Sequence, residues 1–293
     1  MPPIPKLSIG LPVYNGERYL GEAIDAILAQ SFGDFELIVS DNASTDATAH
    51  IARAAAARDE RVTYHRNSQN LGAAANFTVV SRKATAPYFK WACADDRVAP
   101  GFLEAALREL DAHPEAVVCY GAVTIIDAEG REIGTHEQGL DLRSPDVSER
   151  FARASTYVGR LNVLQGVVRT DVLARVAPHG AYQGSDIVLV AELSLHGRIH
   201  EISAPMLFRR MHPQAASAAE SVEQKMAHLD PNKRFSTYYW RRSIEHLRAI
   251  ARAPLPTRSK VRLAARVLRT MIQIRDHLTG ELRDAVAHLR SQF

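Results

Sequence analysis

Short apolar runs alternate with longer amphipathic stretches through the first 130 residues of the chain. Short apolar runs are typical of buried strands, whereas apolar residues spaced three and four apart are typical of helices that bury one face. The alternation therefore predicts βαβ units, with a mixed, mostly parallel α/β sheet flanked by helices. The expected strands cover residues 7–11, 35–40, 62–65, 88–92 and 117–120, and the expected helices cover residues 18–30, 46–58, 73–84 and 100–112.

The pattern is less regular in the second half of the chain. Helices are expected over residues 148–154, 171–176 and 187–196, and strands over residues 199–202 and 206–209. Beyond Pro231 the spacing is helical, and Pro254 and Pro256 divide this part into two segments because proline interrupts a helix. The second segment carries an apolar stripe, interrupted by Arg275, that consists of Val261, Ala265, Leu268, Ile272, Leu278, Leu282, Val286 and Leu289.

The composition is that of a globular protein with one large domain and an appendage. The chain has 293 residues, of which 46% are hydrophobic and 24% charged, which excludes a disordered or fibrous protein. Cys93 and Cys119 are too few for a disulfide framework or a cysteine-ligated zinc site, so a reducing cytoplasm is expected. Neither a signal peptide nor an apolar run near the ~20 residues of a spanning helix is recognisable.

Positive charge is concentrated in the expected C-terminal helical extension. Residues 232–293 contain 14 Lys/Arg against 4 Asp/Glu, whereas residues 1–231 contain 22 against 29. Such an extension is able to contact the inner face of a membrane or a second subunit, and it is equally compatible with a solvated helix face. A nucleic-acid partner is not expected, because no recognition motif accompanies the basic residues. The aromatic cluster at residues 238–240 fits a subunit interface, a membrane anchor or packing within the chain.

Polar side chains follow the first expected strand. In an open parallel sheet, ligands bind beyond the carboxyl ends of the strands, so residues at these positions are candidates for a site. The first strand is followed by a segment in which a base could stack on the aromatic ring and be read by short polar groups. This segment contains Pro12, Tyr14, Asn15 and Glu17.

The ends of two further strands carry carboxylates. Asp41 and Asn42 follow the second strand and are able to bind a base or a ribose, although they are also ordinary turn and capping residues. Asp95 and Asp96 follow the fourth strand as an adjacent pair. Because two like charges repel one another, a divalent cation would stabilise this pair. Capping of the next helix is the alternative for the pair.

Together these segments resemble the family 2 inverting glycosyltransferases of the GT-A fold. The resemblance spans about residues 6–212 and is carried by four motifs in the family's order: residues 12–15, residues 35–44, the Asn70-Leu-Gly72-x3-Asn76 stretch and the carboxylate pair. The resemblance implies that Pro12, Tyr14 and Asp41 hold the nucleotide base. Asn15, Glu17, Asn42 and Asn70 are further nucleotide-binding candidates. It also implies that Asp95 binds in the ribose and metal region and that Asp96 binds Mn²⁺ or Mg²⁺. The family's metal motif is commonly Asp-x-Asp, and Cys93 stands here in the place of its first aspartate.

The resemblance also suggests a catalytic base and a phosphate region. The family places the base at the start of a helix, often as a Glu-Asp pair. Here Ser185 takes the place of the glutamate, which leaves Asp186 as the general base or, alternatively, as a helix N-cap. The Arg209-Arg210-Met-His212 stretch would close the donor site, with His212 as a further metal ligand. Gln165, Gly166 and Arg169 are weaker candidates for the sugar or acceptor region.

The resemblance implies a catalytic domain over residues 1–212, with a nucleotide-binding half up to about residue 120, an acceptor-binding half over 121–212, and the extension over 213–293. The donor would be a UDP-, dTDP- or GDP-linked sugar, and the acceptor a glycan, a glycolipid or a small molecule. A sugar-phosphate nucleotidylyltransferase is the alternative enzyme, but the glycine-rich basic loop of that class does not follow the first strand. A non-catalytic nucleotide-sugar-binding protein is a further alternative, and the absence of G-x-G-x-x-G argues against a dinucleotide oxidoreductase.

Overall fold

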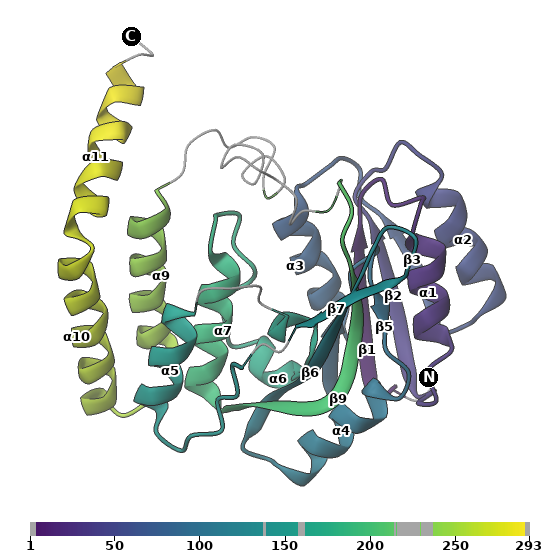
Figure 1. Ribbon diagram of the computed structural model, residues 1–293, viewed down its shortest axis with the longest axis horizontal. Coiled ribbons are helices and arrows are strands. Elements are labelled where there is room, and N and C mark those ends of the chain that lie inside the picture. The colour runs from purple at the N-terminus through teal and green to yellow at the C-terminus, as the bar shows by residue number, and fades with distance from the viewer. Residues whose placement is uncertain are drawn as a thin grey trace.

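A single mixed sheet lies at the centre of the protein (Figure 1). The computed structural model describes residues 4–136, 139–157, 162–213, 215, 229 and 237–290. Within these ranges the sheet has nine strands. They are β1 (Leu7–Val13), β2 (Phe35–Asp41), β3 (Val62–Arg66), β4 (Tyr88–Trp91), β5 (Arg97–Val98), β6 (Ala116–Ile126), β7 (Glu132–His136), β8 (Val167–Arg169) and β9 (Arg198–Arg210).

The strand order is β3-β2-β1-β4-β8-β6-β9-β5, and β7 pairs with β6 outside this path. The first four strands in this order are all parallel, which confirms the βαβ units expected from the N-terminal pattern. In the other half, β8 is antiparallel to both β4 and β6, whereas β6 and β9 are parallel. The expected strands at residues 199–202 and 206–209 are one strand, β9, whose pairing with β6 contains register shifts.

Helices cover both faces of the sheet. Figure 1 shows α1 and α2 on one side and α3 and α7 on the other. Helix α1 is amphipathic, and its buried residues Leu20, Ala23, Ile24 and Ile27 recur at spacings of three, one and three. The helices are α1 (Leu20–Leu28), α2 (Thr48–Arg58), α3 (Ala73–Lys83), α4 (Phe102–Ala112), α5 (Val147–Thr156), α6 (Thr170–Leu173), α7 (Ser185–His196), α9 (Tyr238–Arg252), α10 (Thr257–Gln273) and α11 (Arg275–Arg290), with a short 3₁₀ helix η1 (Val163–Gln165).

The C-terminal helices are docked on the part of the chain that contains the sheet. Residues of α9 and α10 belong to the same apolar core as the sheet. Arg252 of α9 donates two hydrogen bonds, of 2.9 and 3.0 Å, to the fully buried carboxylate of Glu192 in α7. Removing the arginine would strongly destabilise the fold, because the buried carboxylate of Glu192 would lose its opposite charge.

The aromatic cluster of residues 238–240 packs within the chain. The indole of Trp240 donates to the carbonyl of Leu278 at 2.9 Å, and Glu281 of α11 accepts from the backbone amides of Tyr239 and Trp240. The ring of Tyr239 stacks on His277. Of the three possibilities for this cluster, the structure therefore favours packing within the chain, with α9 and α11 held together.

The apolar stripe of the second C-terminal segment faces outward. Its members Val261, Leu268, Ile272, Leu282 and Val286 are 47 to 64% exposed. The residues that α10 buries are instead Leu263 and Val267, on a different face of the helix, whereas Leu278 of the stripe is buried. The segment is also two helices, α10 and α11, with Ile274 between them. The side chain of Leu289 lies outside the described residues.

We predict that burial of His246 makes the stability of the protein depend on pH. This side chain of α9 is 5% exposed and packs edge-on against Phe151 of α5. Burial, assisted by the charge of Arg242, lowers the pKa of His246 to about 3. The unfolded chain, with a histidine pKa of about 6.5, therefore binds this proton first, and stability is lost as the pH falls from 6.5 towards 3.

The measurement is the free energy of unfolding from chemical denaturation at several pH values. His246→Phe removes the titrating group. As the pH is lowered, the free energy of unfolding of this variant should therefore fall less steeply than that of the wild type, and the two slopes should differ by up to about 1.4 kcal/mol per pH unit. His50→Phe, at an exposed position, controls for the loss of one histidine. Equal slopes for the wild type and His246→Phe would show that His246 does not cause the effect.

Candidate active site

The strand-end residues gather at one edge of the sheet. Because β2, β1 and β4 are neighbours and parallel, the loops that follow them lie side by side. These loops carry Tyr14, Asn42 and the Asp95/Asp96 pair. The end of β9 reaches the same edge, where the backbone amide of Arg210 donates to Asp96 at 2.9 Å.

The loops after β1 and β2 are hydrogen-bonded to each other. The backbone amide of Asn15 donates to the Ser44 hydroxyl, and the side-chain oxygen Oδ1 of Asn15 accepts from the backbone amide of Thr45, both at 2.9 Å. The carboxylate of Glu17 likewise accepts from the amide of Ala47 at 2.9 Å. Asn15 and Glu17 therefore fix the shape of this edge.

The ring of Tyr14 is left exposed between these loops. It is 49% exposed although it follows a fully buried strand, and Pro12, two residues earlier, is buried in that strand opposite Ser40. An exposed aromatic face at the end of a parallel strand is a suitable platform for a planar ligand.

Asp41 is fully buried and has three protein donors. Its carboxylate accepts from the amide of Ser44 at 2.8 Å, from the hydroxyl of Tyr64 at 2.8 Å and from the guanidinium of Arg66 at 2.7 Å. Burial raises the pKa of Asp41, but these hydrogen bonds and the charge of Arg66 outweigh burial and leave the pKa below its ordinary value. Asp41 is therefore an anion that orders the turn and orients Tyr64 and Arg66.

Asn42 joins the end of β2 to the loop before α3. Its side-chain nitrogen Nδ2 donates to Oδ1 of Asn70 at 2.7 Å. Its side-chain oxygen Oδ1 accepts from the backbone amide of Leu71 and from the side chain of Asn67, both at 3.0 Å. Asn70 in turn accepts from the amide of Gly72 at 2.9 Å. In this structure Asn42 and Asn70 bind each other and shape the loop.

The carboxylate pair forms a compact cluster with Cys93. One ligand atom from each of Cys93, Asp95 and Asp96 lies within 4.8 Å of the others. Capping of the next helix does not explain the pair, because α4 begins at Phe102 after Gly101, with β5 in between. The cluster therefore needs another source of compensation for its charge.

Burial, followed by the charge of Asp95, raises the pKa of Asp96 to about 6. The amide of Gln165 donates to Asp96 at 3.1 Å, and His212 lies 3.2 Å from Asp95. Two carboxylates at a strand end fit Mg²⁺ or Mn²⁺, which prefer oxygen ligands and keep sites open for phosphate and water. Burial raises the pKa of Cys93 well above its ordinary value, so its thiol stays protonated and is a poor ligand for such ions.

The two arginines at the end of β9 differ in their surroundings. Arg210 is 3% exposed, and its guanidinium donates to Glu22 and to the carbonyls of Asp95 and Ala128. It therefore fastens the loop around the carboxylate pair. Arg209 is partly exposed, and its charge opposes the burial that raises the pKa of Cys93 and of Asp96, which places it near the cluster. Of the two, Arg209 is the better placed for a phosphate.

The three weaker candidates lie in different places. Gln165 contacts Asp96, whereas Gly166 lies so close to β6 that an added Cβ would come within 2.4 Å of the Cys119 carbonyl. Arg169 pairs in register with Tyr88 at the start of β4, and its guanidinium donates to the carbonyl of Leu110. The structure thus places Arg169 at the opposite edge of the sheet, and we remove it from the candidate site.

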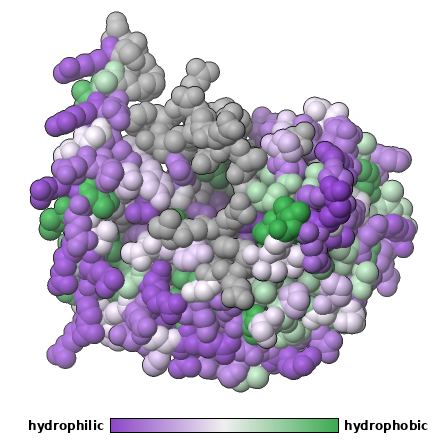
Figure 2. All heavy atoms as spheres, in the orientation of Figure 1, coloured by the Kyte–Doolittle hydropathy of each residue, from purple (hydrophilic) through white to green (hydrophobic). Residues whose placement is uncertain are grey.

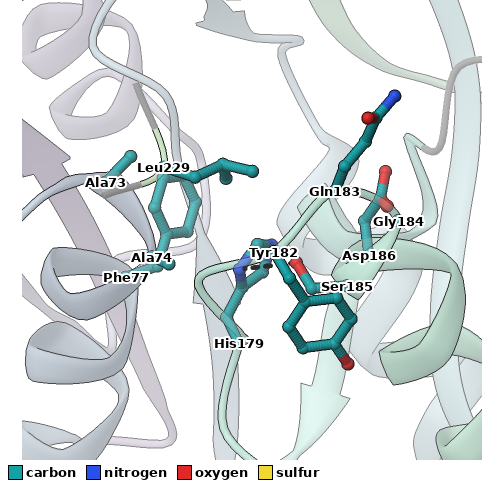
Figure 3. A pocket seen from close by; sticks show the side chains of 10 residues that line it. All are labelled: Ala73, Ala74, Phe77, His179, Tyr182, Gln183, Gly184, Ser185, Asp186 and Leu229. Carbon is teal, nitrogen blue, oxygen red and sulfur yellow. Dashed lines mark hydrogen bonds between the residues drawn. The ribbon is translucent and has the colours of Figure 1, made fainter. Parts of the chain in front are cut away.

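Asp186 lines a cavity of about 280 Å³ beside α3 (Figure 3). Figure 3 shows Phe77 and Leu229 on one side and Tyr182, Gln183 and Asp186 on the other. Helix α7 begins at Ser185 after Gly184, so Asp186 lies in the first turn and is not the N-cap. A carboxylate is favourable there because of the helix dipole.

The cavity and the carboxylate pair are connected through α3 and β4. The indole of Trp91, two residues before Cys93, donates to the carbonyl of Phe77 at 3.0 Å, and the two rings contact each other. His179 stacks near Phe77 and lies 3.4 Å from the hydroxyl of Ser185. Burial lowers the pKa of His179, although the charge of Asp186 opposes this effect.

Several residues of the site were not expected from the sequence. Arg66 and Tyr64 on β3 contact Asp41, and Lys90 is fully buried on β4, where it donates to the carbonyl of Gln165. Burial lowers the pKa of Lys90 to about 8. A lysine between Phe89 and Trp91, inside an apolar strand, is a sequence signal for a buried charge near the site. Arg66 and Tyr64 carry no such signal, because polar residues are ordinary in an edge strand.

A family comparison identifies the chain. The model of glycosyl transferase family 2 matches residues 8–165, more than half of the chain. The chain therefore belongs to glycosyl transferase family 2, which confirms the resemblance carried by the strand-end motifs.

Curated relatives share the N-terminal half. The chain is 35% identical over 127 residues to the putative glycosyltransferase EpsE of Bacillus subtilis, a match that covers 43% of this chain and 46% of EpsE. It is 34% identical over 130 residues to an uncharacterized glycosyltransferase of Haemophilus influenzae, covering 44% of this chain and 52% of that protein. The matched part therefore spans about half the length of these two relatives, and only 18% of an uncharacterized glycosyltransferase of Rickettsia bellii that is 32% identical over 128 residues.

Solved structures show the same fold over almost the whole chain. The crystal structure of S. aureus TarS 1–349 in complex with UDP-GlcNAc matches with a TM-score of 0.66 at 17% identity, covering 95% of this chain and 80% of that one. The complex of the same protein with UDP matches with a TM-score of 0.63 at 18% identity, covering 92% and 72%. The expected GT-A fold is thereby confirmed.

We predict that Asn42 is a main structural support of the site. Asn42→Ala removes a buried amide that has four hydrogen bonds, and it leaves partners such as the amide of Leu71 unpaired. The free energy of unfolding from chemical denaturation should fall by about 2–3 kcal/mol. Gln69→Ala, an exposed position in the same loop, should change it by less than about 0.5 kcal/mol. A similar small loss for both variants would contradict the role of Asn42.

Proposed function

We propose that the protein is an inverting glycosyltransferase that moves a sugar from a nucleotide-diphosphate sugar to an acceptor hydroxyl, with a divalent cation and an aspartate base. The observation that carries the proposal is the Asp95/Asp96 pair at the carboxyl end of β4. The exposed Tyr14 follows the neighbouring strand β1, and Trp91 of β4 contacts Phe77 in the wall of the Asp186 cavity. Family membership supports the reaction class, and the fold agrees with it.

The donor is proposed to bind over the loops after β1, β2 and β4. The base stacks on Tyr14, and Arg66, held by Asp41 and 38% exposed, lies at the rim of this region. A UDP-linked sugar is the first choice, because the neighbouring S. aureus TarS was crystallised with UDP and with UDP-GlcNAc. A dTDP- or GDP-linked sugar is the alternative.

The diphosphate is proposed to lie at the carboxylate pair. Asp96 and Asp95 would hold Mn²⁺ or Mg²⁺, with His212 as an additional ligand. The bound ion would stabilise the negative charge that develops on the leaving diphosphate. Arg209, beside this cluster, is proposed to pair with a phosphate oxygen.

Asp186 is proposed to be the general base. An alcohol is a weak nucleophile at neutral pH, so a carboxylate within hydrogen-bond reach must accept its proton as the new bond forms. The cavity beside Asp186 is walled by Phe77, His179 and Tyr182. Aromatic walls of this kind suit the apolar face of a sugar ring, so we prefer a glycan or glycolipid acceptor to an unrelated small molecule.

The reaction is proposed to take place in the cytoplasm, with peripheral contact at the inner face of the membrane through α10 and α11. The free thiols of Cys93 and Cys119 support a reducing compartment. Within the described residues, no helix has the length and apolar character needed to cross a bilayer. A homo-oligomer through the same helices is the alternative use of this surface.

The donor reaction and its metal dependence test the proposal together. Among UDP-, dTDP- and GDP-sugars, we expect one to be hydrolysed or transferred in the presence of Mn²⁺, with loss of the activity when the metal is chelated. Asp96→Asn, which keeps the size of the side chain, should lower this activity at least a hundredfold and abolish the response to Mn²⁺.

Asp284→Ala, at an exposed position of α11, is the control for the loss of a carboxylate. Turnover of a sugar phosphate with a nucleoside triphosphate would favour a nucleotidylyltransferase. Saturable nucleotide binding without any turnover would favour a non-catalytic protein. A Mn²⁺ titration of Asp96→Asn that is the same as that of the wild type would remove the metal assignment.

A second variant tests the base. Asp186→Asn should lower transfer by at least a hundredfold, because the amide cannot accept the proton, while the affinity for the nucleotide stays within a few-fold. Steady-state transfer and nucleotide titration by calorimetry give the two quantities. Asp171→Asn replaces an exposed carboxylate and should have little effect on either. Retained turnover in Asp186→Asn would exclude Asp186 as the base.

A further inference from the structure

The outer side of α10 combines an apolar stripe with positive charge. Val261, Leu268 and Ile272 are 62, 50 and 64% exposed, and with Ala265 they follow one another at spacings of four, three and four residues. These spacings bring the side chains onto one narrow line along the helix. The stripe is therefore a continuous exposed feature, separate from the buried line of Leu263 and Val267.

Positive side chains border this stripe. Helix α10 contains five Lys/Arg residues and no acidic residue. Within the part of the chain that the structure describes, no ion pair is formed by its exposed arginines, which are Arg258, Arg262, Arg266 and Arg269. Helical spacing places these arginines along one side of the stripe, on the side that is farther from the buried Leu263 and Val267. Their long apolar stems can lie along the stripe while the guanidinium groups reach a polar layer.

Helix α11 extends the same surface. Figure 1 shows α10 and α11 following one another as a single rod along one margin of the molecule, with α11 reaching past the rest of the body. Leu282 and Val286 of α11 are 50 and 47% exposed, and Arg283 lies beside them. In Figure 2 this margin shows hydrophobic groups among strongly hydrophilic side chains.

We infer that α10 and α11 form a surface that binds an anionic lipid bilayer in a plane parallel to the helices. An apolar line bordered by arginines is the arrangement with which an amphipathic helix lies in the headgroup layer, because the apolar side chains enter the acyl boundary and the cations pair with lipid phosphates. A second copy of the chain would bring the same uncompensated arginines together. The charge of α10, which has five basic residues and no acidic one, thus favours an anionic partner over self-association.

The inference has a consequence for the acceptor. Helix α9 lies between α10 and the start of α7, which carries Asp186; there the ring of Tyr238 approaches Gly184, and Arg241 lies over Tyr182 (Figure 1). A bilayer-bound enzyme of this shape would use an acceptor presented at the membrane, such as a lipid-linked glycan. That consequence rests on the proposed sugar-transfer reaction, whereas bilayer binding gives the membrane contact of the proposed function its lipid partner and does not depend on the reaction.

Sedimentation with vesicles tests the inference on the full-length protein. Vesicles of phosphatidylcholine with about 30% phosphatidylglycerol should sediment the wild type at least tenfold more strongly than vesicles of phosphatidylcholine alone, and high salt should release it. The triple variant Arg262→Gln, Arg266→Gln and Arg269→Gln should lose at least tenfold in this partition. Arg82→Gln, Lys83→Gln and Arg108→Gln remove the same charge from exposed positions elsewhere and should change it by less than threefold.

The apolar part is tested by Leu268→Ser with Ile272→Ser, which should also weaken sedimentation while thermal unfolding stays close to that of the wild type, because both side chains are exposed. Equal sedimentation with the two kinds of vesicle, or none with either, would overturn the inference. It would also be overturned if velocity sedimentation showed a dimer that Leu268→Ser with Ile272→Ser converts to monomers. Donor hydrolysis, measured separately without vesicles, keeps a failure of this inference apart from a failure of the proposed reaction.

Discussion

The buried carboxylate of Asp96 organises the functional edge of the protein. Burial and the neighbouring Asp95 both disfavour its charge, so the fold brings donors to it from distant segments. The amide of Arg210 comes from the end of β9, and the side chain of Gln165 comes from η1. These contacts draw the second half of the sheet to the end of β4, which is where a divalent cation and a diphosphate would need a preformed site.

A second buried carboxylate fastens the C-terminal helices to the rest of the chain. The side chain of Glu192 in α7 is fully buried. The guanidinium of Arg252 in α9 donates one hydrogen bond to each of its carboxylate oxygens. Since Asp186 lies in the first turn of α7, the position of α9 influences where this residue lies. The close approach of Tyr238 to Gly184, whose φ is 81°, reinforces this influence. Helix α9 thus packs against residues that line the candidate acceptor cavity, such as Gly184 and Tyr182.

The elements that were predicted well have a strong local pattern. Strands β1 to β4 and helices α1 to α4 follow from apolar runs and helical spacing, because each buries one continuous set of side chains. Strands β5 and β8 contain two and three residues, too short to carry a periodic signal. The outward direction of the α10 stripe was also not predictable, since both lines of apolar residues have helical spacing and only docking selects one for burial.

By itself, the sequence determined the α/β class, the family, and the strand-end positions of Tyr14, Asp41, Asp95 and Asp96, because these depend on local order along the chain. Only the tertiary structure decided how such residues are used. In the folded chain Asp41 is buried and accepts hydrogen bonds from Tyr64 and Arg66. Arg169 lies at the end of the sheet opposite to the site. Arg210 is bound within the fold, whereas its neighbour Arg209 is partly exposed. Burial and hydrogen-bond partners come from segments far apart in the chain, so no local pattern can specify them.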